Sequence, residues 1–303
     1  MGIIETKELT KRFKHVLAVD RVNLEIEEGE CFGLLGPNGA GKTSLVRMIT
    51  AVSPPTEGEV WVQGSSLEHC AREAKAMMGV IPQLDNLDPD LTVWQNLMTF
   101  ARYFNVPKKM ARQRCSDLLA LLKLEDKRNS AIRELSGGMR RRLLIARGLI
   151  NNPRIVILDE PTIGLDPQAR HLVWQKLTEL EAQGVTRILC THNMDEAATL
   201  CDRVAIMYEG RVLDLDSPAA LVASHVGSEV WEIQMNPEDR DTVLAGLESR
   251  RLDFEDAGTH VYVFHLDSGQ ALGGLIGDGQ RVKQRPATLE DVFFRLTGRS
   301  LIE

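Results

Sequence analysis

The chain has 303 residues and a mass of 33.8 kDa, which is enough for about two domains of roughly 150 residues each. Hydrophobic residues make up 43% and charged residues 26%, a balance that indicates a globular protein and excludes a disordered or fibrous one. The formal net charge of −7 argues against a nucleic-acid binder, so we expect no nucleic-acid partner. No apolar run approaches the roughly 18–20 residues that a membrane-spanning helix needs.

The cysteines and the N-terminus bear on where the protein works. Five cysteines with no CxxC pair are typical of a reducing cytosol rather than of a disulfide framework or a zinc site. The first residues show no signal-peptide core, and residues 1–6 fit a loose myristoylation pattern. We favour the alternative that residues 3–6 begin an edge strand, followed by a turn over residues 7–10. These patterns predict a cytoplasmic protein.

Short apolar runs alternate with helical stretches in the first two-thirds of the chain. Residues 32–35, 155–158 and 187–191 are apolar runs bounded by polar turns, which predicts strands buried on both faces of a parallel sheet. Residues 43–49 repeat apolar side chains at helical spacing. Strands that alternate with helices predict an α/β fold.

A helical region interrupts this alternation. Two helices are predicted at residues 92–103 and 108–124, with Pro107 at the break between them, and a third at residues 140–149. We therefore expect a helical insertion of about residues 84–150 within a first domain of residues 1–224.

A second domain is predicted over residues 228–303. Its pattern predicts a helix at residues 237–250, a glycine-rich helix at 268–276 and a last helix opened by the cap Thr288-Leu-Glu-Asp291. Strands are predicted at residues 230–235, 261–264 and near Val282. This composition predicts a small α+β domain, and its sequence shows no catalytic constellation.

A glycine-rich loop follows the first predicted buried strand and precedes a helix. Residues 36–43 read Gly-Pro-Asn-Gly-Ala-Gly-Lys-Thr, a P-loop in the context that phosphate binding demands. Its glycines let main-chain amides face phosphates, Lys42 is expected to reach the β- and γ-phosphates, and the Thr43 hydroxyl is expected to bind Mg²⁺. The ATP-binding residues expected here are Gly36, Pro37, Asn38, Gly39, Ala40, Gly41, Lys42, Thr43 and Ser44.

Two adjacent acids, Asp159 and Glu160, end the predicted strand at residues 155–158. Buried acids are costly unless a cation neutralises them. We expect Asp159 to hold Mg²⁺ and Glu160 to orient or deprotonate the attacking water. The alternative is a strand that ends in two solvated acids.

The sequence Leu-Ser-Gly-Gly-Met at residues 135–139 precedes the predicted helix at 140–149. Ser136, Gly137 and Gly138 can form an anion site at its N-terminus. The P-loop, this sequence and the acid pair together resemble the ATP-binding cassette (ABC) family over residues 3–216. The resemblance implies a P-loop NTPase fold with a RecA-like parallel core and antiparallel N-terminal strands, with ATP and Mg²⁺ as cofactors. It also implies a homodimer in which Ser136 completes the partner's ATP site.

The same resemblance implies roles for four further residues. Gln83 matches a glutamine that contacts Mg²⁺ and the attacking water, and His192 matches a catalytic histidine that contacts the γ-phosphate. Asp166 matches an ATP-site residue of the loop that crosses the dimer interface, and Phe13 matches an aromatic that stacks on adenine. Met139 stands where the family more often has glutamine. Because this change removes no contact with phosphate, metal or water, we expect an active ATPase.

Three consecutive arginines, Arg140, Arg141 and Arg142, follow the Leu-Ser-Gly-Gly-Met sequence. A basic run of this kind suggests a nucleic-acid contact. Given the acidic net charge, we interpret it instead as the solvated face of the helix.

Residues 30–36, 82–87 and 288–299 resemble a narrower group, the ATP-binding subunits of type-two ABC exporters, which includes the nodulation-factor and daunorubicin-resistance exporters. The resemblance implies ATP-driven dimerisation that powers efflux through a separate integral-membrane permease, docked on the helical insertion at the cytoplasmic face of the inner membrane. An alternative is a non-transport ABC ATPase that acts as a soluble ATP switch. Repair and translation cassettes are disfavoured because this sequence has no zinc cysteines, long coiled coil or second P-loop.

Overall fold

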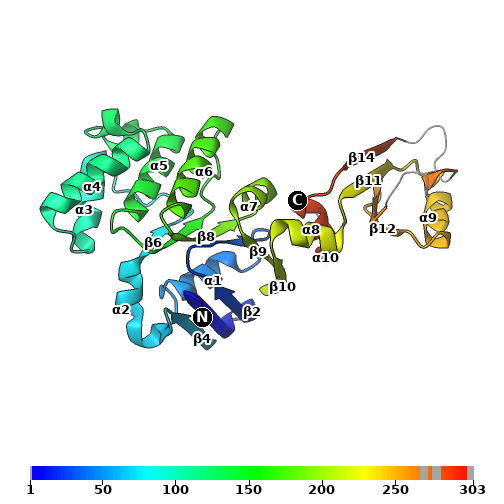
Figure 1. Ribbon diagram of the computed structural model, residues 1–303, viewed down its shortest axis with the longest axis horizontal. Helices are drawn as coiled ribbons and strands as arrows, with labels where there is room; N and C mark the ends of the chain where they lie inside the picture. Colours follow the sequence, from blue (N-terminus) through cyan, green and yellow to red (C-terminus); the bar gives the residue numbers. More distant parts are fainter. Residues whose placement is uncertain (1, 267–271, 275–280, 299–303) are drawn as a thin grey trace. The chain divides into compact units, whose positions relative to one another are not determined.

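The computed structural model describes residues 2–266, 272–274 and 281–298, and its elements are shown in Figure 1. The chain divides into two compact units, Met1–Leu215 and Asp216–Glu303. The sequence pattern places the boundary later, between residues 224 and 228. The difference arises because helix α8 (Pro218–His225) packs against α10 (Leu289–Thr297). In the described part of the chain, no helix is both long enough and apolar enough to cross a bilayer.

A six-stranded sheet forms the centre of the first unit and confirms the predicted α/β class. Three of its four inner strands are buried at every residue, as their uninterrupted apolar runs predict, and they pair in parallel. Their carboxyl ends therefore meet at one edge of the sheet. In spatial order the strands are β10 (Arg211–Asp216), β9 (Arg203–Tyr208), β3 (Cys31–Leu35), β8 (Thr186–Thr191), β7 (Ile155–Asp159) and β6 (Met78–Ile81).

A second, antiparallel sheet begins the chain, as expected for this fold. Its spatial order is β2 (Val16–Ile26), β1 (Ile4–Phe13), β4 (Glu57–Val62) and β5 (Ser65–Ser66). The prediction of an edge strand with a turn over residues 7–10 is wrong, because β1 pairs on both sides and continues through those residues. Glu8 adopts a left-handed φ of 48° where the pairing register shifts, so the expected turn is a bulge.

Three helices lie side by side within residues 84–150, as Figure 1 shows: α3 (Val93–Tyr103), α4 (Lys108–Leu121) and α5 (Gly137–Gly148). Thr92 and Gln95 close a reciprocal capping box at the start of α3, and Pro107 precedes α4. The α4 helix ends at Leu121, before the predicted residue 124. The other helices of this unit are α1 (Lys42–Ile49), α2 (Leu67–Met77), α6 (Pro167–Glu181) and α7 (Met194–Leu200).

The second unit has a four-stranded antiparallel sheet and fits the predicted α+β class. In spatial order its strands are β12 (Asp253–Asp256), β13 (His260–Phe264), β11 (Glu229–Gln234) and β14 (Val282–Pro286). Helix α9 (Arg240–Ser249) covers a core that includes Ile233 and Val261. The sequence pattern did not predict β12. The predicted glycine-rich helix at 268–276 falls largely outside the described residues.

An ion pair joins β14 to α10 in the second unit. Arg285 donates from Nη1 and Nη2 to the two carboxylate oxygens of Asp291, at 2.8 and 2.6 Å. Asp291 is buried and also accepts from the main-chain amide and hydroxyl of Thr288, which closes the predicted helix cap. Hydrogen bonding to Asp291 is the largest cause of a raised pKa of Arg285. The pair therefore fixes where α10 begins.

We predict that Arg285→Ala destabilises this unit by about 2 kcal/mol, because it leaves the buried Asp291 carboxylate without its charged donors. Native-state hydrogen exchange of α10 and β14 amides in the full chain measures this change. Lys283→Ala, at an exposed position of the same strand, is the matched control. It should change the free energy of unfolding of this unit by less than about 0.5 kcal/mol. Equal effects of the two substitutions would contradict the prediction.

Candidate functional site

The predicted P-loop joins β3 to α1, and close main-chain approaches require glycine at two of its positions. Gly41 has φ 104°, and a Cβ added there would lie 2.3 Å from the Ala18 carbonyl oxygen. A Cβ on Gly36 would lie 2.2 Å from the Met207 carbonyl oxygen. Any side chain at either position would displace β2 or β9, so glycine is needed at both.

The Lys42 side chain turns back into the loop and is buried. Its ammonium donates to the carbonyl oxygens of Gly36, at 2.5 Å, and Pro37, at 3.1 Å, and lies 3.7 Å from Oε1 of Glu160. Burial lowers the pKa of Lys42, and the nearby Glu160 carboxylate opposes that shift. A cation is thus held at the centre of the loop, where phosphates would lie.

Asp159, at the end of β7, fits the expected metal-binding role. Its Oδ2 accepts a hydrogen bond of 3.2 Å from the Thr43 hydroxyl, whereas its buried Oδ1 has no hydrogen-bond partner among the described residues. Burial is the largest cause of the raised pKa of Asp159, and the Thr43 hydrogen bond opposes it. Carboxylate and hydroxyl oxygens are ligands that Mg²⁺ prefers, so Asp159 and Thr43 fit this ion.

Glu160 lies between Lys42 and His192 and is buried. Its Oε2 is 2.8 Å from Nδ1 of His192, and its main-chain amide donates to the Cys190 carbonyl oxygen at 2.8 Å. Glu160 has a left-handed φ of 51°, a conformation that costs a non-glycine residue about 1–3 kcal/mol. Strain of this kind persists only where the surroundings hold the main chain in place.

A cavity of about 480 Å³ brings most of the predicted residues together. The residues that line it and were predicted are Phe13, Pro37, Asn38, Gly39, Ala40, Gly41, Lys42, Thr43, Ser44, Gln83, Asp159 and Glu160. Phe13 and Val16 present exposed apolar side chains at this cavity, as a binding face for a planar base would.

Four residues that no sequence pattern indicated also line the cavity: Val16, Leu17, Ala18 and Glu209. The first three begin β2, and β1 ends at Phe13 just before them. Their nearness to Phe13 in the sequence could have indicated that they lie at the same cavity. Glu209 follows β9, far away in the sequence, and no local pattern indicates it.

Four other residues predicted to contact ATP are not among the residues that line this cavity: Ser136, Gly137, Gly138 and Asp166. Ser136 accepts from the Met139 amide at 3.3 Å and caps α5, while Asp166 accepts from the Ala169 amide at 2.9 Å and caps α6. Gly137 has open space where a Cβ would point. Ser136 and Asp166 thus have a local structural role as helix caps, whereas no neighbouring atom requires a glycine at position 137.

The prediction that the arginine run is solvated is wrong for Arg141, which is 5% exposed. Its guanidinium donates to the carbonyl oxygens of Pro82, Asp159 and Pro161. Of three consecutive helical residues, one must turn toward the core side of an α-helix, since successive residues are 100° apart. Residue 141 shares the buried face with Leu144 and Ile145, and this periodicity is the signal that could have identified it.

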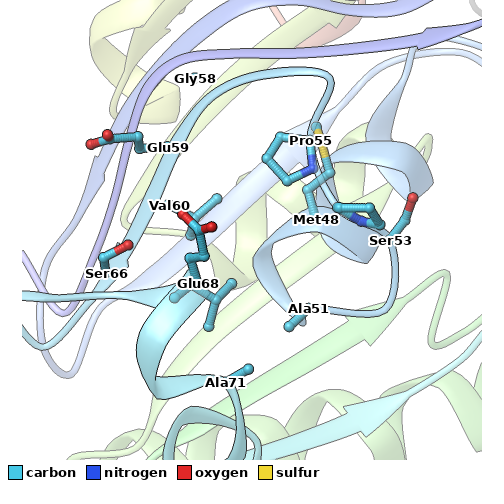
Figure 2. A pocket seen from close by; sticks show the side chains of 12 residues that line it. Met48, Ala51, Ser53, Pro55, Gly58, Glu59, Val60, Ser66, Glu68 and Ala71 are labelled. Atoms are coloured by element: carbon cyan, nitrogen blue, oxygen red, sulfur yellow. The ribbon is translucent and has the colours of Figure 1, made fainter.

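A separate hollow of about 400 Å³ lies in the same unit and contains none of the predicted residues. Figure 2 shows Met48 and Pro55 on one side of it, Val60 near its middle, and Glu68 and Ala71 of α2 on the other. Met48 of α1 thus lines this hollow, whereas the P-loop residues line the other cavity.

Comparison with known proteins identifies relatives of this chain. A family model described as "ABC transporter" matches residues 19–163. The Nod factor export ATP-binding protein I of Burkholderia thailandensis is 44% identical over 300 residues, covering 98% of both chains. The protein of the same name from Ralstonia nicotianae is 42% identical over 308 residues, covering 99% of this chain and 95% of that one.

Solved structures of nucleotide-binding cassettes are similar to this chain. The dimeric post-hydrolysis structure of the ATP-binding cassette MJ0796 with ADP and Pi is 29% identical, with a TM-score of 0.66, and covers 71% of this chain and 98% of that one. The cbiO1 protein of Clostridium perfringens, part of the ABC transporter complex cbiONQ, is 28% identical with a TM-score of 0.67, covering 73% of this chain and 91% of that one.

We predict that Lys42→Ala lowers the affinity for Mg·ATP by about 10–100-fold, equivalent to roughly 1.5–3 kcal/mol for hydrogen bonds to charged groups. The substitution removes the cation from the loop and leaves Glu160 without it, so the phosphates meet net negative charge. Titration calorimetry measures the affinity, with Lys75→Ala on the exposed side of α2 as control. Unchanged affinity in Lys42→Ala would count against this site.

Proposed function

The chain belongs to the ATP-binding subunits of the ABC transporter family and is an ATP hydrolase, and from this premise we propose that it powers an exporter whose permease is a separate membrane protein. One observation supports export above all: the similarity to the Nod factor export protein covers 98% of both chains. It thus includes the second unit, beyond the residues that the family model matches.

The cavity residues have distinct proposed roles in hydrolysis. The P-loop amides and Lys42 bind the phosphates, and the Phe13 ring supports the base. Thr43 and Asp159, with Gln83 in the same cavity, would hold Mg²⁺, which would neutralise phosphate charge. Glu160 orients or deprotonates the attacking water, and its contact with His192 keeps the carboxylate directed into the site.

We further propose that two copies form the complete ATP site. Ser136, Gly137, Gly138 and Asp166 lie apart from the cavity of their own chain, so they would contact the nucleotide held by the partner copy. Support comes from the similar MJ0796 cassette, whose structure with ADP and Pi is dimeric.

The helical insertion is the proposed docking site for the permease. Leu84 is 79% exposed and Tyr103 is 75% exposed, so both offer apolar surface that a permease would cover on binding. Leu84 directly follows Gln83, which lines the nucleotide cavity, so a partner bound there would contact the segment that carries Gln83. In this arrangement the protein works at the cytoplasmic face of the inner membrane.

We predict that the permease encoded beside this chain, when reconstituted with it in vesicles, stimulates ATP hydrolysis, and that Leu84→Glu weakens this stimulation by about tenfold. A charge placed in an apolar contact must be desolvated without a partner. Val52→Glu is the matched control because Val52 is also exposed but lies outside the insertion. If the neighbouring gene encodes a nuclease or a ribosomal factor instead, the exporter proposal fails.

Glu160→Gln tests the proposed mechanism most sharply. The amide keeps the size of the side chain but cannot act as a base, so turnover should fall by about 10²–10⁴-fold. Binding of Mg·ATP should survive because the P-loop and Asp159 are unchanged. The substitution removes a negative charge near the γ-phosphate, which favours the dimer that encloses ATP. The variant should therefore accumulate as an ATP-bound dimer on size-exclusion chromatography.

Glu68→Gln, an exposed acid on α2, serves as the control for this charge change. It should retain both turnover and the nucleotide-free elution volume. Near wild-type turnover in Glu160→Gln would show that the base lies elsewhere, and His192 would be the next residue to substitute.

A further inference from the structure

The Arg141 guanidinium donates hydrogen bonds to the main chain on both sides of Glu160. Its Nη2 donates to the carbonyl oxygen of Asp159 at 2.9 Å, and its Nε donates to that of Pro161 at 2.7 Å. These are the residues directly before and after Glu160. The Glu160 amide is itself held by the Cys190 carbonyl oxygen at 2.8 Å. The left-handed main chain of Glu160 is therefore fixed on both sides.

The same guanidinium also holds the segment that carries Gln83. Its Nη1 donates to the Pro82 carbonyl oxygen at 2.5 Å and lies 3.5 Å from that of Gln83. Arg141 thus joins three places that converge on the nucleotide cavity: the end of β7, the residue after Glu160 and the residue before Gln83. Its four hydrogen bonds all go to main-chain carbonyls.

A second buried arginine of α5 holds the other end of the Gln83 segment. Arg147 donates to the main-chain and side-chain oxygens of Asn86, and its guanidinium lies 4.3 Å from the Phe100 ring centroid. Residues 82–86 are therefore attached to α5 at both ends. Because Arg141, unlike Arg147, also donates to Asp159 and Pro161, it links this segment to Glu160.

We propose that Arg141 is a positioning residue for ATP hydrolysis, which fixes the Glu160 main chain and the Gln83 segment in one relative geometry. Arg141 does not line the nucleotide cavity, so it acts through Glu160 and Gln83 rather than by contact with ATP. The inference rests on ATP hydrolysis by this chain and is independent of whether the chain serves an exporter.

Arg141→Lys is the principal test. Lysine keeps the charge, but its compact ammonium has three N–H donors at one point and cannot reach four carbonyl oxygens spread along two segments, as the planar guanidinium does. We expect kcat to fall by about 10–100-fold, the scale expected when a catalytic group is misplaced by about 1 Å. The affinity for Mg·ATP should stay within about threefold, because the P-loop is untouched.

Two further measurements separate positioning from general stability. Hydrogen exchange of the nucleotide-free full chain should become faster over residues 82–86 and 160–163 in Arg141→Lys. In the Glu160→Gln background, Arg141→Lys should reduce single-turnover hydrolysis by a clearly smaller factor than in the wild-type background, because the part of its effect that acts through the Glu160 carboxylate is then lost.

Arg142→Lys is the matched control. Arg142 neighbours Arg141 on α5 and donates to the Leu122 and Lys123 carbonyl oxygens, away from the nucleotide cavity. It should leave kcat and the exchange of these segments unchanged. Arg141→Gln, which places no buried charge, repeats the test in case the lysine variant does not fold.

The proposal is overturned if folded Arg141→Lys or Arg141→Gln hydrolyses ATP within twofold of Arg142→Lys. An equal loss of hydrolysis in the wild-type and Glu160→Gln backgrounds would also overturn it, because Arg141 would then act independently of Glu160. If neither Arg141 variant folds while Arg142→Lys does, Arg141 is a folding determinant and the positioning role is refuted. Loss of activity in the single variant Glu160→Gln tests whether Glu160 is the general base. It does not decide whether Arg141 positions Glu160, so the two proposals can fail separately.

Discussion

Two carboxylates and one ammonium group are buried together at the carboxyl edge of the central sheet, and the site depends on their mutual compensation. Burial raises the pKa of Asp159 and lowers that of Lys42, so each isolated charge would be unfavourable. Their proximity offsets this cost, with Lys42 3.7 Å from Glu160 and the Thr43 hydroxyl bonded to Asp159. The parallel order of β3, β8 and β7 makes that proximity possible, since their ends share one edge.

Close packing of the main chain fixes the position of the P-loop, and with it that of Lys42. The P-loop approaches β2 and β9 so closely that Gly36 and Gly41 have no space for a side chain. Ala18, whose carbonyl limits Gly41, also lines the nucleotide cavity. The antiparallel sheet is consequently part of the site, and displacement of β2 would move the loop and the base-binding face together.

The sequence predicts what short-range patterns specify and misses what depends on distant partners. The P-loop, the Asp159-Glu160 pair and the cap that opens α10 are local spacings, and the structure contains each of them. The interior position of β1 depends on pairing with β4, some 50 residues later, so an apolar pattern alone cannot distinguish it from an edge strand. To predict that Arg141 is buried, one must know which side of α5 faces the core. No sequence pattern near Glu209 indicates that it lines the cavity.

The segment after Glu160 is held by two helices at once. Arg141 of α5 binds the Pro161 carbonyl, while Glu196 of α7, buried at 1% exposure, accepts from the Thr162 hydroxyl at 2.8 Å. His192 lies at the entrance of α7 and contacts Glu160. Glu160, His192 and residues 161–162 therefore share supports from α5 and α7, so a substitution that loosens either helix contact should also displace Glu160.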